Sequence, residues 1–212
     1  MKLFQWLVVC AFLSSLPAAL AQKWEFGGGA GTGFYTSNDL TSPAGTASAK
    51  IKPNLAASAW LANDKNKWGG ELRYNYQRGD LQLKQASTVA TFGAEAHSIH
   101  YDFLYHFKDQ EWNVRPFVAF GAGIKMFKGT GQEVLAQPLS RIALLTKAQD
   151  LVAMASVGAG FKVRLSEHAQ LRVDVHDYIT PFPKEVIVPV SGSSGKGWFN
   201  DIVPMVGIAW TK

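Results

Sequence analysis

The sequence predicts an all-β fold, an eight-stranded antiparallel up-and-down transmembrane β-barrel, from three observations. Apolar and polar residues alternate with period two through much of the chain after residue 22, and this alternation is the signal of half-buried strands. Short polar connections between these segments alternate with long ones. Tryptophans collect beside the short connections. A closed barrel that crosses a membrane accounts for all three patterns.

The first residues read as a secretory signal peptide. Lys2 gives a positive start, residues 3–16 form an almost unbroken apolar run, and Ala19 and Ala21 are small residues at the positions that a signal peptidase reads. A membrane anchor would need about 20 apolar residues, more than this run offers. We therefore expect a mature chain that begins at Gln22. The predicted organisation is a cleaved signal peptide, residues 1–21, followed by one outer-membrane β-barrel domain, residues 22–212.

Composition narrows the function classes. The length of 212 residues suits one domain. The formal net charge of +5 is mild and spread along the chain, so nothing in it indicates nucleic-acid binding. The single cysteine, Cys10, lies inside the predicted signal peptide, which predicts a mature protein without disulfide or thiolate chemistry.

The alternating segments give eight predicted strands. In one of them Trp68, Leu72 and Tyr74 share one face, while Glu71 and Arg73 share the other. The eight predicted strands cover residues 23–35, 54–62, 68–77, 99–107, 118–126, 157–165, 171–176 and 198–211.

The connections sort by length. Three are short and polar, at residues 63–67, 108–113 and 166–170. The four long ones cover residues 36–53, 79–90, 129–150 and 180–197. Outer-membrane barrels have short periplasmic turns and longer external loops. The long connections are thus predicted external loops that could take a surface ligand, because loops often carry recognition. For residues 135–151 we favour an extended hairpin over a short helix begun by Pro138.

Aromatic residues predict the two edges of the membrane, because their rings favour the membrane–water interface. The tryptophans near the short turns and chain ends form the predicted periplasmic girdle: Trp24, Trp60, Trp68, Trp112 and Trp210. A second set could form the opposite girdle: Tyr35, Tyr76, Phe127, Tyr178 and Trp198.

The polar faces of the predicted strands carry balanced charges. The residues expected to point inward are the acids Glu25, Glu71, Asp102, Asp174 and Asp201 and the bases Arg73, Lys125, Lys162, Arg164 and Arg172. The interior of an eight-stranded barrel is just wide enough for side chains to fill it. Isolated buried charge is very costly, so these groups should pair and plug the lumen. The alternative is a lining that selects solutes, which needs an open bore.

Histidines on one predicted strand raise two further hypotheses. Ser98 and His100 share a face, as a membrane-embedded hydrolase would require, and a metal could be held by His100, Asp102 and His106 with a ligand from another strand. We predict neither catalysis nor a metal or other cofactor, and expect lumen histidines bonded to carboxylates. The glycine-rich residues 192–197 lack the Ser or Thr and the helix of a phosphate-binding loop.

Several segments resemble a known family. Residues 115–123, 157–161 and 171–174 are similar to strands of the small outer-membrane β-barrel proteins, the OmpA-transmembrane-domain and OmpX-like group. The resemblance runs from Lys23 to Lys212 and implies the outer membrane of a Gram-negative bacterium. Two features depart from the family pattern. We expect no peptidoglycan-binding domain of the longer OmpA-type proteins after the barrel, and the last residues are Thr211 and Lys212 where many such barrels end in an aromatic residue.

The sequence therefore predicts a non-catalytic outer-membrane barrel with a plugged, charge-paired lumen. It would act in envelope structure or in surface interaction through its four external loops. The alternatives are a narrow or gated channel, a membrane-embedded lipid hydrolase, and a soluble lipocalin-like periplasmic barrel. The expected partners are outer-membrane lipid, the barrel-assembly machinery and a possible surface ligand, with the protein itself a monomer.

Overall fold

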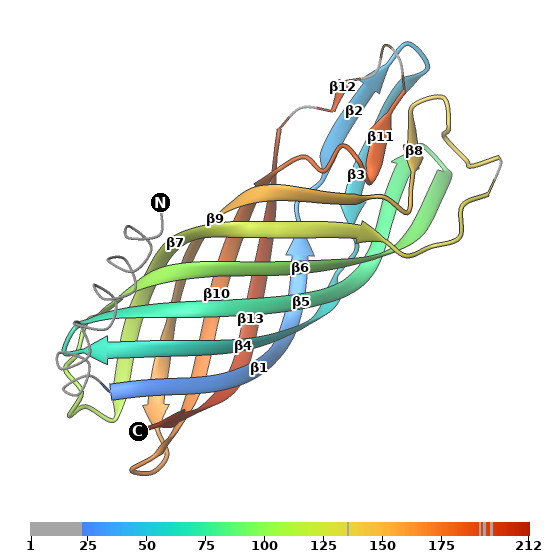
Figure 1. Ribbon diagram of the computed structural model, residues 1–212. Helices are drawn as coiled ribbons and strands as arrows, with labels where there is room; N and C mark the ends of the chain where they lie inside the picture. The colour runs from blue at the N-terminus through green and yellow to red at the C-terminus, as the bar shows by residue number, and fades with distance from the viewer. Residues whose placement is uncertain (1–22, 135, 191, 193, 196) are drawn as a thin grey trace, which may run out of the picture.

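Eight long antiparallel strands form a closed ring in the computed structural model, which describes residues 23–134, 136–190, 192, 194–195 and 197–212. The ring order is β5-β4-β1-β13-β10-β9-β7-β6, and β6 pairs with β5 to close it (Figure 1). The predicted eight-stranded up-and-down barrel is confirmed. The ring strands are β1 (Lys23–Tyr35), β4 (Asn54–Lys65), β5 (Trp68–Gln85), β6 (Thr88–His106), β7 (Val114–Gly129), β9 (Gln149–Arg164), β10 (Ala169–Pro181) and β13 (Trp198–Thr211).

The predicted signal peptide lies outside the described residues. Among the residues that are described, no helix is long and apolar enough to cross a membrane.

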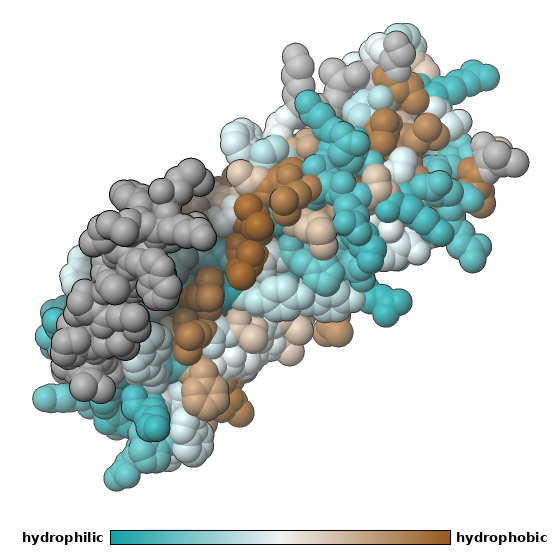
Figure 2. All heavy atoms as spheres, in the orientation of Figure 1, coloured by the Kyte–Doolittle hydropathy of each residue, from teal (hydrophilic) through white to brown (hydrophobic). Residues whose placement is uncertain are grey.

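The apolar face of each strand points outward. On β5, Leu72 and Tyr74 are 47% and 43% exposed, whereas Arg73 between them is fully buried. Phe103 and Phe120 stack on the outer wall with their ring centroids 5.7 Å apart. Figure 2 shows apolar side chains along the wall and hydrophilic ones gathered toward its two ends. This arrangement, apolar outside and polar inside, is the reverse of a lipocalin-like barrel.

Short turns and both ends of the barrel sequence meet at one end of the ring. β4 and β5 are joined through Asn66 and Lys67, and Asn66 has a φ of 55°, a left-handed conformation that asparagine tolerates. Residues 107–113 and 165–168 form the other two short connections. Here Trp24 and Lys212 exchange backbone hydrogen bonds of 3.1 and 2.9 Å. By the loop asymmetry of outer-membrane barrels, this is the periplasmic end.

At the other end, β5 and β6 continue past the ring to a two-residue turn, Ala86–Ser87. The predicted loop at 79–90 is therefore wrong. The alternation persists there, with Leu81 and Leu83 facing inward and Gln82 facing outward, so the backbone stays paired.

The predicted loop at 36–53 also contains strands. β2 (Asn38–Ser42) and β3 (Gly45–Ile51) form a hairpin, and β3 pairs with β5 so that Ile51 faces Leu81. β12 (Ser194–Gly195) adds to the edge of β2. The strands β12-β2-β3-β5-β6 thus form an external sheet that projects from the ring (Figure 1).

The extended hairpin expected for residues 135–151 is also wrong over the described part of this segment. β7 ends at Gly129, and the chain turns at Leu139, whose φ of 66° interrupts any strand. β8 (Ala143–Leu145) then pairs with β11 (Ile187–Pro189) from the following connection. This two-stranded sheet packs on the external sheet. Together they enclose an external core of Leu40, Ala47, Ala49, Ile51, Leu81, Leu83, Ala90, Phe92, Ala94, Ala96, Phe127, Ile142, Ala143, Leu145, Phe182, Val186, Ile187 and Phe199.

Candidate functional site

Four ion-paired side chains from opposite walls meet in the middle of the barrel. Arg73 on β5 donates to Glu71 Oε1 at 2.7 Å and to Asp174 Oδ2 on β10 at 2.9 Å. Arg172 on β10 donates to Asp174 Oδ2 at 2.5 Å and to both carboxylate oxygens of Glu71. All four are at most 5% exposed. Each arginine thus bridges both acids, which satisfies charges that could not be buried singly.

A histidine pair lies next to this square of charges. His100 Nδ1 is 3.0 Å from Asp102 Oδ1, and His176 Nε2 is 3.4 Å from Asp102 Oδ2. Ser156 donates to the same carboxylate at 3.3 Å. His176 Nδ1 lies 3.3 Å from Asp174 Oδ1, which joins the pair to the central square. The lumen histidines are therefore held against carboxylates.

Toward the periplasmic end, a second cluster closes the floor of the barrel. Lys162 lies 2.6 Å from Glu25 Oε2 and 3.1 Å from Asp64 Oδ2, and Arg115 lies 3.0 Å from the same Asp64 oxygen. Arg164 was expected inside this network, and that prediction is wrong. Its side chain is exposed at the mouth, because β9 ends there, and it donates to the main-chain oxygen of Gln110.

Toward the external end, Lys125 marks the boundary between polar and apolar interior. Its ammonium lies 2.5 Å from Asp201 Oδ2 and 4.7 Å from the centroid of the Tyr35 ring. Phe127, one inward position further along β7, already belongs to the external core. Below Lys125 the interior holds the paired charges together with small buried apolar clusters, such as the one that contains Met154 and Met205, and above it the interior holds packed apolar side chains.

Trp60 belongs to this interior and not to the periplasmic girdle. Its side chain is 5% exposed, its indole N–H donates to Glu25 Oε1 at 2.9 Å, and Arg172 lies 5.0 Å from its ring centroid. The cause is strand parity, because Trp60 shares its face of β4 with Ser58 and Asp64, which also point inward.

Glycines make room for this ring. A Cβ atom on Gly207 would lie 2.6 Å from the Trp60 ring and 2.5 Å from the Gly28 main-chain oxygen. Real Cβ atoms do not approach so closely, so the narrow barrel requires glycine where the indole crosses it.

Gly207→Ala is therefore expected to destabilise the folded barrel by about 1–3 kcal/mol, the usual cost of an overpacked interior. The matched control is Gly28→Ala on the neighbouring strand, whose Cβ would find its nearest neighbour at 3.3 Å. Urea unfolding of both variants in lipid vesicles measures the difference. Equal urea midpoints for the two variants would show that the Trp60 ring does not require a glycine at position 207.

The other four tryptophans of the predicted periplasmic girdle lie on the outer surface. Trp24, Trp68, Trp112 and Trp210 are 40–60% exposed near the short turns and chain ends. The opposite girdle is partly wrong. Tyr76 and Trp198 point outward, but Tyr35, Phe127 and Tyr178 point inward.

The possible catalytic set does not assemble. Asp102 does orient His100, an acid contact that the sequence alone did not reveal. However, His100 Nε2 faces Asn75 Nδ2 at 3.2 Å, and the same amide donates to Ser98 at 3.3 Å. Asn75 thus occupies the place where a base would meet its nucleophile. Among the described residues, no cluster of three or more His, Asp or Glu side chains is arranged to hold a metal ion.

Sequence reasoning missed several members of the interior network: Asp64, Asn75, Gln77, Arg115 and His176. Strand parity could have found them. Asp64 follows Trp60 and Ala62 at intervals of two, and Arg115 precedes Phe117 and Ala119 in the same way. Asp64 and Arg115 were overlooked because the predicted strands stopped too early at these ends. Asn75, Gln77 and His176 lie within predicted strands, but the predicted network was built from charged residues alone.

Known structures share this architecture. Neisserial surface protein A matches with a TM-score of 0.55 and 10% identity, over 89% of this chain and 96% of that chain. OprG from Pseudomonas aeruginosa matches with a TM-score of 0.59 and 15% identity, over 91% and 96%. Ail, the attachment invasion locus protein of Yersinia pestis, matches with a TM-score of 0.51 and 10% identity, over 90% and 99%.

At such low identities these matches establish the fold alone, and no curated protein sequence matches the chain. The family model of the outer membrane protein beta-barrel domain matches residues 7–196, most of the chain. The predicted resemblance and the outer-membrane location are confirmed. The chain belongs to the outer membrane protein beta-barrel domain family, whose members reside in the Gram-negative outer membrane.

Proposed function

We propose that this outer-membrane protein is a closed, non-catalytic barrel that acts in envelope structure or surface interaction through its external segments. The observation that carries the proposal is the double filling of the interior. Paired charges with small apolar clusters between them occupy the membrane-spanning part, and the external core lies above them. A solute would have to break both layers to pass.

The two layers resist opening for different physical reasons. Separating the arginines from Glu71 and Asp174 would leave charge unpaired in a low-dielectric interior. Separating the β8–β11 sheet from the external sheet would expose apolar side chains such as Leu83, Phe92 and Ile187 to water. A plug built in this way stays closed without a dedicated gate.

The external sheet also offers a surface suited to recognition. Outward-facing charged residues begin just beyond the apolar wall. Arg78 on β5, Glu95 on β6 and Lys128 on β7 lie side by side on adjacent strands. Lys128 lies 2.9 Å from Glu95 and lowers the pKa of that carboxyl by hydrogen bonding. Lys50 and Lys84 stand further out on the same face. Asp39 and Asp80 lie on this face too, so its charges are of both signs and nearly balanced. A rigid sheet with such a surface would favour a partner with complementary charges of both signs.

Conductance tests the closed state. Folded protein in a planar bilayer should show no large, steady current, because neither layer leaves a continuous aqueous path. The control is the same lipid without protein, after removal of contaminating porins. A large ohmic conductance in the unmodified protein would overturn the proposal.

A narrow channel is the second candidate, and one observation favours it. Several buried polar atoms in the described lumen lack a hydrogen-bond partner within the protein, among them Ser58 Oγ, Asn75 Oδ1 and Asp201 Oδ1. Such atoms are usually satisfied by internal water. A thin file of water through the lumen would give small, flickering currents in the same bilayer experiment.

A further inference from the structure

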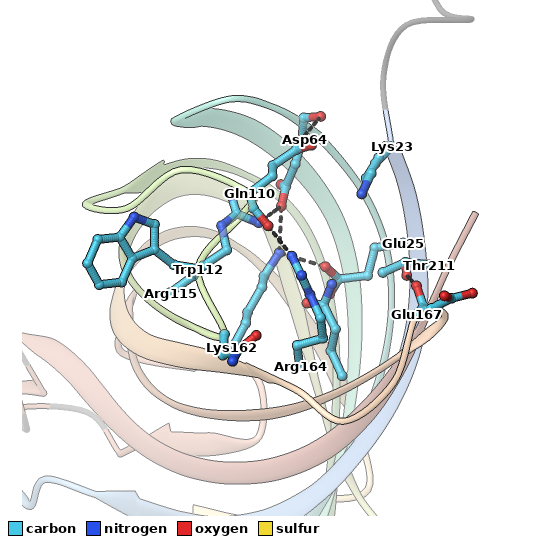
Figure 3. Close-up of a pocket in the computed structure, with 12 residues that line it drawn as sticks. Lys23, Glu25, Asp64, Gln110, Trp112, Arg115, Lys162, Arg164, Glu167 and Thr211 are labelled. Carbon is cyan, nitrogen blue, oxygen red and sulfur yellow. Dashed lines mark hydrogen bonds and ion pairs between the residues drawn. The ribbon is translucent and has the colours of Figure 1, made fainter.

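The periplasmic mouth contains a cavity of about 250 Å³ that the closed-barrel proposal does not use. It lies below the Lys162 cluster and is bounded by the ends of β1, β4, β7, β9, β10 and β13 and by two short turns. Figure 3 shows its charged side chains gathered around the barrel opening. The volume equals that of about eight water molecules, room for the end of a short chain.

The floor of this cavity is rigid and electrically balanced. Glu25, Asp64, Arg115 and Lys162 are each at most 5% exposed. Their ion pairs of 2.6–3.1 Å join four different strands. A floor without net charge adds no attraction for a group with two negative charges, such as phosphate.

The rim of the cavity carries two cations, Lys23 and Arg164, and one exposed acid, Glu167, so it has a net positive charge that the balanced floor does not neutralise. Lys23 and Arg164 line it from β1 and β9, and among the described residues no carboxylate lies within 4.0 Å of either. Arg164 uses one N–H on the main-chain oxygen of Gln110, which leaves further donors of its guanidinium for another group. Lys23 and Arg164 together could bind one carboxylate, because an arginine can donate hydrogen bonds to both carboxylate oxygens.

The cavity also offers acceptors. Gln170 Oε1 and Asp64 Oδ1 are buried atoms of lining residues, and neither has a hydrogen-bond partner among the described residues. A buried acceptor without a donor is costly, so a ligand that supplies N–H groups would be favoured. A ligand that complements this cavity would therefore carry a carboxylate and amide N–H donors in one small molecule.

We infer that the periplasmic mouth binds the free C-terminal carboxylate of a short peptide. Lys23 and Arg164 hold the carboxylate, and the peptide N–H groups donate to Gln170. The assignment is independent of whether the barrel conducts, because the cavity lies on the periplasmic side of the ion-paired floor.

Binding of acetyl-dialanine and of its C-terminal amide, measured by calorimetry on the folded protein in detergent, tests the inference. The acid is expected to bind at least about tenfold more tightly than the amide, since a charge-assisted hydrogen bond is lost in the amide. Arg164→Gln and Lys23→Gln should each reduce the binding affinity of acetyl-dialanine by about the same factor. Equal binding of acid and amide, or binding of neither, would overturn the inference.

Lys147→Gln is the matched control, because Lys147 is an exposed lysine on the external side. It should leave peptide binding unchanged, and cold migration on SDS gels verifies that each variant is folded. If Lys147→Gln weakens binding as much as Arg164→Gln does, the peptide responds to overall charge and the mouth is not its site.

Cell-wall peptides and the C-termini of periplasmic proteins share this chemistry, and a sedimentation experiment distinguishes them. Cosedimentation with isolated peptidoglycan, lost in Arg164→Gln, would identify the cell wall as the source. Binding of acetyl-dialanine without cosedimentation would identify protein C-termini.

Discussion

Arg172→Ala is expected to destabilise the folded barrel by about 3–5 kcal/mol, the cost of removing one partner from a buried ion pair. Arg172 contacts Glu71 and Asp174 at the centre of the lumen, and both acids are almost fully buried. After the substitution Arg73 remains to balance two carboxylates, so one negative charge is left without a partner. Urea unfolding in lipid vesicles, followed by tryptophan fluorescence, measures the change.

Arg164→Ala is the control for this experiment, because it removes the same side chain from the exposed mouth, where it makes one hydrogen bond to a main-chain oxygen. It should cost less than about 1 kcal/mol, as exposed contacts usually do. If both arginine variants unfold at the same urea concentration, the central square does not stabilise the barrel.

Phe103→Arg is expected to cost about 2–4 kcal/mol if its site lies near the midplane of the membrane, because a charge on the lipid face must leave water. Phe103 is 51% exposed on the outer wall and stacks on Phe120 of the neighbouring strand. The measurement is again urea unfolding from vesicles, with the yield of heat-modifiable protein on SDS gels as a second readout.

Gln132→Arg supplies the comparison for the lipid face, since Gln132 is exposed in the connection after β7, beyond the outward charges of Lys128 and Glu95. An added charge there meets water and should be nearly neutral. Similar losses in the two variants would contradict the placement of the β6–β7 wall in lipid.

Most of the barrel could be predicted from the sequence because its physical rule is local. Each strand alternates between lipid and lumen, so neighbours such as Leu72 and Arg73 reveal their sides directly. Trp60 and Tyr35 were wrongly assigned to the aromatic girdles. The assignment used the residue type and its position near a strand end, and did not ask which face of the strand the residue occupies. Both residues share their strand face with inward charges, Asp64 for Trp60 and Glu25 for Tyr35. Parity would have corrected both.

The external core could not be predicted in the same way. Its sheet joins Leu145 on β8 to Ile187 on β11, two short segments in different connections. Short apolar runs of this kind show no periodicity from which their secondary structure or their pairing partner could be predicted. The mouth cavity was missed for a similar reason, because Lys23, Arg164 and Gln170 come from three strands and meet only when the ring closes.

The central ion pairs also set the order in which the protein can fold. Glu71 and Arg172 are 101 residues apart in the chain, and so are Arg73 and Asp174. No hairpin of neighbouring strands contains both partners. Until β5 and β10 face each other across a nearly complete ring, each half of the chain holds one acid and one base without the partners from the opposite wall. The pairs across the lumen therefore form only when β5 and β10 come to face each other, and a chain truncated before β10 would have no Arg172 or Asp174 to complete the square.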